Sequence, residues 1–166
     1  MAKINGNIRH VFFDVDGVLS APCYFDDANG EFTIGFTDEG WRNYLNNEGV
    51  YAYKYCSPVK QISDFITQLN SLGVNAYVLS VVENDVEARS KDLFIDEKYP
   101  GMFKDRFYVE HEDDKARFMV EFAVSRGIDA GSCMLVDDTY SILTQCRAHG
   151  LCACHLSNIL ADNITK

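Results

Sequence analysis

The sequence predicts an α/β fold: a three-layer, doubly wound parallel sheet of about five strands, with a small insert after the first strand. Short apolar runs rich in β-branched and aromatic residues alternate with stretches of helical periodicity along the 166 residues. The apolar runs are nearly continuous, which is typical of strands buried on both faces. Regular alternation of strand and helix favours parallel strands joined by right-handed crossovers, with helices on both faces of the sheet.

Five apolar runs are expected to form the sheet. In chain order they are His10–Val15, Val74–Ser80, Arg106–Val109, Ser132–Val136 and Leu151–His155. Four segments between them are predicted helices, namely Val59–Leu72, Asp85–Phe94, Asp114–Arg126 and Ser141–His149. In the third of these helices we expect Phe118, Phe122 and Val124 to face the core. Glycines follow three of the helices as stop signals.

The segment 21–55 interrupts this alternation, and we interpret it as a flap or minimal cap insert within a single domain that spans residues 1–166. Tyr24–Ile34 is predicted to form a hairpin that turns at Asn29 and Gly30. Thr37–Asn47 follows as a short helix with Thr37 as its N-cap.

The acidic composition excludes some functions. Asp plus Glu number 25 against 15 Lys plus Arg, a formal net charge of −10. This balance argues against binding to nucleic acid or to an anionic membrane. The N-terminal residues lack the apolar core of a signal peptide and no long apolar span occurs, so we expect a cytoplasmic protein. The six cysteines form no CxxC pair and are expected to be buried thiols rather than disulfides or zinc ligands.

Acidic and hydroxyl side chains follow three of the predicted strands. Asp14 and Asp16 end the first strand, Ser80 ends the second, and Asp137 and Asp138 end the fourth. Ligands of parallel α/β sheets collect at this edge. A lysine, Lys115, begins the helix before the fourth strand. Carboxylates that hold Mg²⁺, a lysine and a hydroxyl are the groups that phosphoryl transfer to an aspartate requires.

The run Asp14-Val15-Asp16-Gly17-Val18-Leu19 resembles the first motif of the haloacid dehalogenase superfamily. Ser80, Lys115 and Asp137-Asp138 are similar to its second, third and fourth motifs and occur in the family's order. The resemblance covers nearly the whole chain. It implies a phosphatase that uses Mg²⁺, because family members that act on other bonds lack an acid at the position of Asp16.

The resemblance also implies a role for each residue. Asp14 is the expected nucleophile and a metal ligand. Asp16 is the expected general acid and base, and its backbone carbonyl is expected to face the metal. Ser80 is expected to bind the phosphoryl group, and Lys115 to balance charge on Asp14. The remaining expected metal ligands are Asp137 and Asp138.

Two features of the sequence depart from the family pattern. Ser141 and Ile142 stand where many members carry another acid, so the outer part of the metal site depends on Asp138. Ala116 replaces the proline that often follows the third-motif lysine. Lys91 competes with Lys115 for that role, but its position inside a helix indicates a solvated surface residue.

The insert is both acidic and aromatic. Between residues 21 and 51 it carries six acidic residues against one arginine. Its aromatic residues have two interpretations: they pack the insert or form a homo-oligomer interface, or they form a wall against the substrate. Since an acidic lid disfavours polyanions, we expect a small monophosphate ester with a neutral or cationic leaving group.

Three other functions stay open at this stage. A phosphotransferase or phosphomutase would use the same aspartyl intermediate with a different acceptor. A non-catalytic binding or scaffold protein could retain the fold. A phospho-receiver domain would need its reactive aspartate after the third strand, where Val109, Glu110 and His111 stand.

Overall fold

The structure, a computed structural model, describes residues 6–161. Five parallel strands form the central sheet in the order β7-β6-β1-β8-β9. Their bounds are β1 His10–Phe13, β6 Asn75–Val81, β7 Asp105–Val109, β8 Cys133–Asp137 and β9 Cys152–His155. The predicted doubly wound α/β architecture is confirmed, and the strand bounds differ from the expected ones by only one or two residues.

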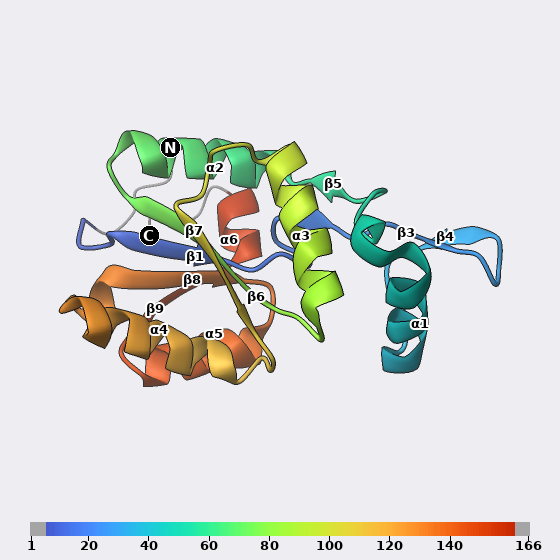
Figure 1. The fold of residues 1–166 in the computed structure, drawn as a ribbon. Coiled ribbons are helices and arrows are strands. Elements are labelled where there is room, and N and C mark those ends of the chain that lie inside the picture. The colour runs from blue at the N-terminus through green and yellow to red at the C-terminus, as the bar shows by residue number, and fades with distance from the viewer. Residues whose placement is uncertain (1–5, 162–166) are drawn as a thin grey trace.

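Helices cover both faces of this sheet (Figure 1). One face carries α2 Lys60–Ser71, α3 Asp85–Lys98 and the short α6 Leu156–Leu160. The other carries α4 Asp114–Arg126 and α5 Tyr140–Ala148, with the 3-10 turn η2 Ala130–Ser132 leading into β8. Each face encloses its own cluster of buried apolar residues.

Strand pleating assigns successive residues to opposite faces. In β1, Val11 and Phe13 belong to the core beneath α2 and α3, whereas Phe12 belongs to the core beneath α4 and α5. The same alternation holds in β6, where Val78 lies on the first side and Leu79 on the second. This alternation decides which helix each residue at the strand ends faces.

The insert lies beyond one end of the sheet (Figure 1). Two antiparallel strands, β2 Ser20–Ala21 and β5 Ser57–Pro58, pair where the chain leaves and re-enters the core. Between them come the hairpin β3 Tyr24–Asp26 and β4 Glu31–Thr33, then α1 Asp38–Glu48 and the turn η1 Gly49–Tyr51. Thr37 caps α1 as predicted, since its hydroxyl accepts a hydrogen bond from the Gly40 amide at 3.2 Å.

Two expectations about side chains need correction. Val124 is 75% exposed and does not face the core. It lies two residues beyond the buried Phe122, and residues two apart on a helix point in different directions. The second concerns Cys23 and Cys152, which are only half-buried. The cysteines are all free thiols, and four of them are buried.

Within residues 6–161, no helix combines the length and the apolar character needed to cross a bilayer.

We predict that Phe13→Ala lowers the free energy of unfolding by about 3–5 kcal/mol, because it empties a packed site. Phe13 is fully buried, and its ring contacts Phe65 of α2 and Phe103. Urea denaturation measures the loss. The control is Phe32→Ala in the insert, where the ring is 59% exposed and the expected change is within about 0.5 kcal/mol. Equal losses in the two variants would contradict this placement of the core.

Candidate active site

The predicted acidic residues converge at the carboxyl end of the sheet. Asp14 directly follows β1, and its amide still donates to the Val136 carbonyl of the neighbouring strand at 3.1 Å. Asp137 is the last residue of β8, and Asp138 follows it. By the alternation of the strands, Asp14 lies on the same side as Phe12 and therefore faces α4.

Lys115, in the first turn of α4, lies between the two buried aspartates. Its Nζ is 3.1 Å from Asp14 Oδ1 and 2.9 Å from Asp137 Oδ2, and it also contacts Glu112 at 2.8 Å. Burial lowers the pKa of Lys115, but the three carboxylates outweigh that effect and raise its pKa overall. The ammonium therefore stays protonated and offsets part of the acidic charge.

The ionisation of Asp14 depends on its surroundings. Its carboxylate is nearly buried, with 6% of the residue exposed. Burial raises its pKa to about 7, reinforced by Asp137 and Asp16 and opposed by Lys115. The carboxylate thus lies in a place where an additional cation would favour its ionised form.

Three carboxylates form a group that fits a hard divalent cation. One oxygen each from Asp14, Asp137 and Asp138 lie within 4.8 Å of one another. Mg²⁺ prefers oxygen ligands and uses few carboxylates, so the donor set suits it. Burial and the neighbouring Asp137 raise the pKa of Asp138. A cation bound there would lower that pKa again, because it favours the ionised carboxylate.

The loop after β1 packs closely against this group. Gly17 has a φ of +73°, and a Cβ added there would lie 2.2 Å from Asp138 Oδ2. Glycine is needed both for the backbone conformation and for the close approach. Asp138 is further placed by His155 Nε2, which lies 3.0 Å from the Asp138 carbonyl oxygen.

Asp16 is held from two sides. Its Oδ2 is 2.8 Å from Lys91 Nζ, and its Oδ1 accepts a hydrogen bond from the Tyr53 hydroxyl at 2.7 Å. The Tyr24 hydroxyl lies at 3.5 Å from the same Oδ1. Burial raises the pKa of Asp16, but Lys91 and Tyr53 more than compensate, so the net pKa is lowered.

Ser80 lies deeper than the carboxylates. It is 1% exposed, and its hydroxyl accepts a hydrogen bond from Lys91 Nζ at 3.1 Å. The structure therefore brings Ser80 into the cluster through Lys91, and its expected contact with a phosphoryl group stays a prediction. The metal role expected of the Asp16 backbone carbonyl stays a prediction as well.

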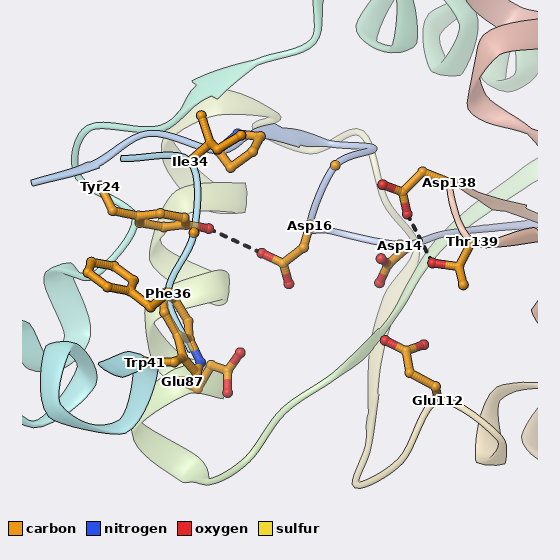
Figure 2. Close-up of a pocket in the computed structure, with 13 residues that line it drawn as sticks. Asp14, Asp16, Tyr24, Ile34, Phe36, Trp41, Glu87, Glu112, Asp138 and Thr139 are labelled. Atoms are coloured by element: carbon orange, nitrogen blue, oxygen red, sulfur yellow. Dashed lines mark hydrogen bonds between the residues drawn. The ribbon is translucent and has the colours of Figure 1, made fainter. Parts of the chain in front are cut away.

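A pocket of about 430 Å³ opens above these residues (Figure 2). One wall carries Asp14, Asp138, Thr139 and Glu112. The opposite wall comes from the insert and presents Tyr24, Ile34, Phe36 and Trp41, with Asp16 between the two walls and Glu87 beside Trp41. The insert thus forms one side of the candidate active site.

The expectation that Lys91 is a solvated surface residue is wrong. Lys91 is 1% exposed and contacts Asp16 and Glu87. Sequence reasoning also missed Glu87, Glu112 and Tyr53 as parts of the site. The spacing of Glu87 and Lys91, four residues apart on a helix that follows the Ser80 strand, was the available signal. Nothing comparable pointed to Tyr53.

The fold and the acidic strand ends together define a known class of architecture. The chain has the α/β fold of haloacid dehalogenase-like hydrolases, as the comparisons with solved structures show. No known family profile and no curated protein sequence matches the chain.

Three solved structures illustrate the similarity. A haloacid dehalogenase-like hydrolase from Streptococcus pneumoniae has a TM-score of 0.60 at 16% identity, over 95% of this chain and 92% of that one. A haloacid dehalogenase family enzyme from Bacteroides thetaiotaomicron, solved with magnesium and phosphate, has a TM-score of 0.57 at 14% identity, over 89% of this chain and 93% of that one. The cobalt-bound deoxy-D-mannose-octulosonate 8-phosphate phosphatase from Haemophilus influenzae has a TM-score of 0.54 at 19% identity, over 90% of this chain and 68% of that one.

We predict that Gly17→Ala disrupts the acidic group more than a matched glycine substitution does. Gly73 has the same φ of +73°, but a Cβ there meets nothing within 4 Å. Both variants are expected to lose roughly 1–2 kcal/mol from backbone strain. Only Gly17→Ala is expected to displace Asp138 and to reduce the rise in melting temperature caused by Mg²⁺. Thermal unfolding with and without Mg²⁺ measures this rise. An equal rise in the two variants would contradict the close packing of the loop on Asp138.

Proposed function

We propose that this protein is a phosphatase that hydrolyses small phosphate monoesters through an aspartyl-phosphate on Asp14, with Mg²⁺ as its cofactor. The observation that carries the proposal is the placement of Asp14. Its carboxylate lines the pocket, the Lys115 ammonium lies 3.1 Å behind it, and two further aspartates lie beside it. Phosphoryl transfer to a carboxylate needs cations near the nucleophile. Lys115 supplies one, and the aspartates beside Asp14 would hold Mg²⁺ as a second. The fold shared with phosphatases is consistent with this reading.

Asp14, Asp137 and Asp138 are the residues that would hold Mg²⁺, with the Asp16 carbonyl as a further expected ligand. The bound cation would supply charge neutralisation, so that a phosphate dianion can approach the carboxylates. Lys115 contributes to the same end from beneath the site, since it is buried and contacts both Asp14 and Asp137.

In the first half of the reaction, an oxygen of Asp14 attacks phosphorus and the bond between phosphorus and the leaving oxygen breaks. Asp16 supplies the proton that the leaving oxygen needs. Its side chain is 44% exposed toward the pocket, so it can reach the substrate. The incoming phosphate dianion favours the protonated form of Asp16, since like charges raise the pKa of a carboxyl.

In the second half, Asp16 accepts a proton from water, and the water oxygen attacks the phosphorus of the aspartyl-phosphate. The bond between phosphorus and the Asp14 oxygen breaks, which releases inorganic phosphate and restores Asp14. The contacts of Asp16 with Lys91 and Tyr53 stabilise the ionised form that this step requires.

The pocket favours a leaving group without negative charge. Six carboxylates surround only two ammonium groups, so the formal charge is strongly negative; the acids are Asp14, Asp16, Glu87, Glu112, Asp137 and Asp138, and the ammonium groups belong to Lys91 and Lys115. Even with Mg²⁺ and a phosphate dianion bound, an excess of negative charge persists. The insert adds the faces of Tyr24, Phe36 and Trp41, which suit an apolar or cationic group.

We predict that Asp14→Asn lowers kcat/KM for 4-nitrophenyl phosphate by at least about 10³-fold, the scale expected when a nucleophile is removed. The assay is release of 4-nitrophenol in the presence of Mg²⁺, with Asp64→Asn as the control. Asp64 lies on α2 and pairs with Lys60 at the surface, remote from the pocket. Equal activity of wild type and Asp14→Asn would refute the mechanism. Competition with added alcohols as acceptors separates a hydrolase from a phosphotransferase.

We predict a preference among phosphate esters that follows charge. Phosphoethanolamine and glycerol phosphate are expected to exceed fructose 1,6-bisphosphate in kcat/KM by about 10-fold or more, because the acidic pocket repels a second phosphate. Release of inorganic phosphate measures the rates. The gap is expected to narrow at high salt, since ions screen the repulsion. Fastest turnover of bisphosphates would show that the acidic walls do not select the substrate.

A further inference from the structure

We infer that Lys91 is a positioning residue for the reaction, which fixes the Asp16 carboxylate in the orientation needed to donate and accept protons. The inference rests on the proposed phosphatase function but adds a residue that the resemblance does not assign. Lys91 lies on α3, on the opposite face of the sheet from Lys115. It is therefore a second buried cation at the same site.

Lys91 Nζ gathers four acceptors from three parts of the chain. It is 2.8 Å from Asp16 Oδ2 in the loop after β1, and 3.1 Å from Glu87 Oε1 one helical turn away. It also donates to the Ser80 hydroxyl at 3.1 Å and to the Val81 carbonyl at the end of β6. The ammonium thus links the proposed acid and base to the end of the strand that carries Ser80.

Burial shows that Lys91 acts through Asp16 and not on the substrate. The Lys91 side chain is 1% exposed, whereas that of Asp16 is 44% exposed. Lys91 is also absent from the pocket lining, which Asp16 and Glu87 share. A substrate in the pocket can touch Asp16 but cannot reach the ammonium behind it.

The two oxygens of Asp16 are held by groups from different parts of the fold. Lys91, in the core, contacts Oδ2 of Asp16. Tyr53, near the end of the insert, donates its hydroxyl to Oδ1. Two contacts on separate oxygens fix both the position and the rotation of a carboxylate, whereas one contact leaves it free to turn. Glu87 holds Lys91 in place, and its other oxygen accepts the Glu83 amide at 2.8 Å.

The test compares two leaving groups. 4-Nitrophenol leaves without needing a proton, whereas the alkoxide of ethyl phosphate needs one. If Lys91 positions Asp16, Lys91→Met should lower kcat/KM for ethyl phosphate by about 10²–10³-fold, within the range of general acid catalysis. The loss in kcat/KM for 4-nitrophenyl phosphate should be about 10-fold or less, because kcat/KM reports the steps up to formation of the aspartyl-phosphate, and with this leaving group those steps do not depend on the acid. An equal loss on both esters, or none on either, overturns the inference.

Controls separate positioning from general damage. Lys98→Met removes a lysine from the same helix that pairs with Glu97 away from the site, and should leave the ratio of the two rates unchanged. Asp16→Asn should show the same leaving-group dependence as Lys91→Met. Adding Lys91→Met to Asp16→Asn should then change the ratio no further, since Lys91 acts through Asp16.

Two further measurements keep the result decisive. Lys91→Met should retain the rise in melting temperature caused by Mg²⁺, because Lys91 pairs with Asp16 and Glu87, whereas Asp14 and Asp137 of the metal group pair with Lys115. If Lys91→Met does not fold, Lys91→Gln replaces it, because glutamine keeps a polar group at this buried position. The same ratio of kcat/KM values for the two esters then decides the outcome. Failure of wild type to hydrolyse either ester would refute the proposed function itself, which separates that outcome from failure of this inference.

Discussion

Repulsion between carboxylates is the constraint on which this site depends. The parallel topology brings the ends of β1 and β8 together, and each end carries two aspartates. Four carboxylates in so small a volume destabilise one another and resist burial. Two lysines relieve this repulsion, each almost completely buried and each in contact with at least two carboxylates. The cluster leaves a place where a divalent cation fits.

The pleat of the strands explains why the two lysines come from opposite layers of the fold. Asp14 and Asp137 face α4, so Lys115 on that helix can contact both. Ser80 lies on the other face, as Val78 does, and is reached by Lys91 from α3. Each lysine thus contacts polar groups on its own side of the sheet. The site is thus supported from each layer of the fold.

The insert joins this support to the pocket. Tyr53 contacts Asp16 directly, and Tyr24, Phe36 and Trp41 pack on one another while lining the pocket. The two interpretations of the aromatic residues are therefore not exclusive. The same rings that hold the insert together also form a wall of the candidate active site. Phe25, Phe32 and Tyr55 form a second group of rings in the insert, of which Phe32 and Tyr55 are exposed.

The sequence by itself determined the succession of strands and helices along the chain and the position of the insert, because these depend on local periodicity. It also selected the candidate site residues Asp14, Asp16, Lys115, Asp137 and Asp138, by the rule that ligands gather at strand ends. Tertiary structure alone decided that Lys91 is buried, that Tyr53 holds Asp16 and that Val124 faces water. Such outcomes depend on which side chains meet across elements distant in the chain. A helical lysine has the same local pattern whether solvent or a carboxylate lies opposite it, so only packing distinguishes the two.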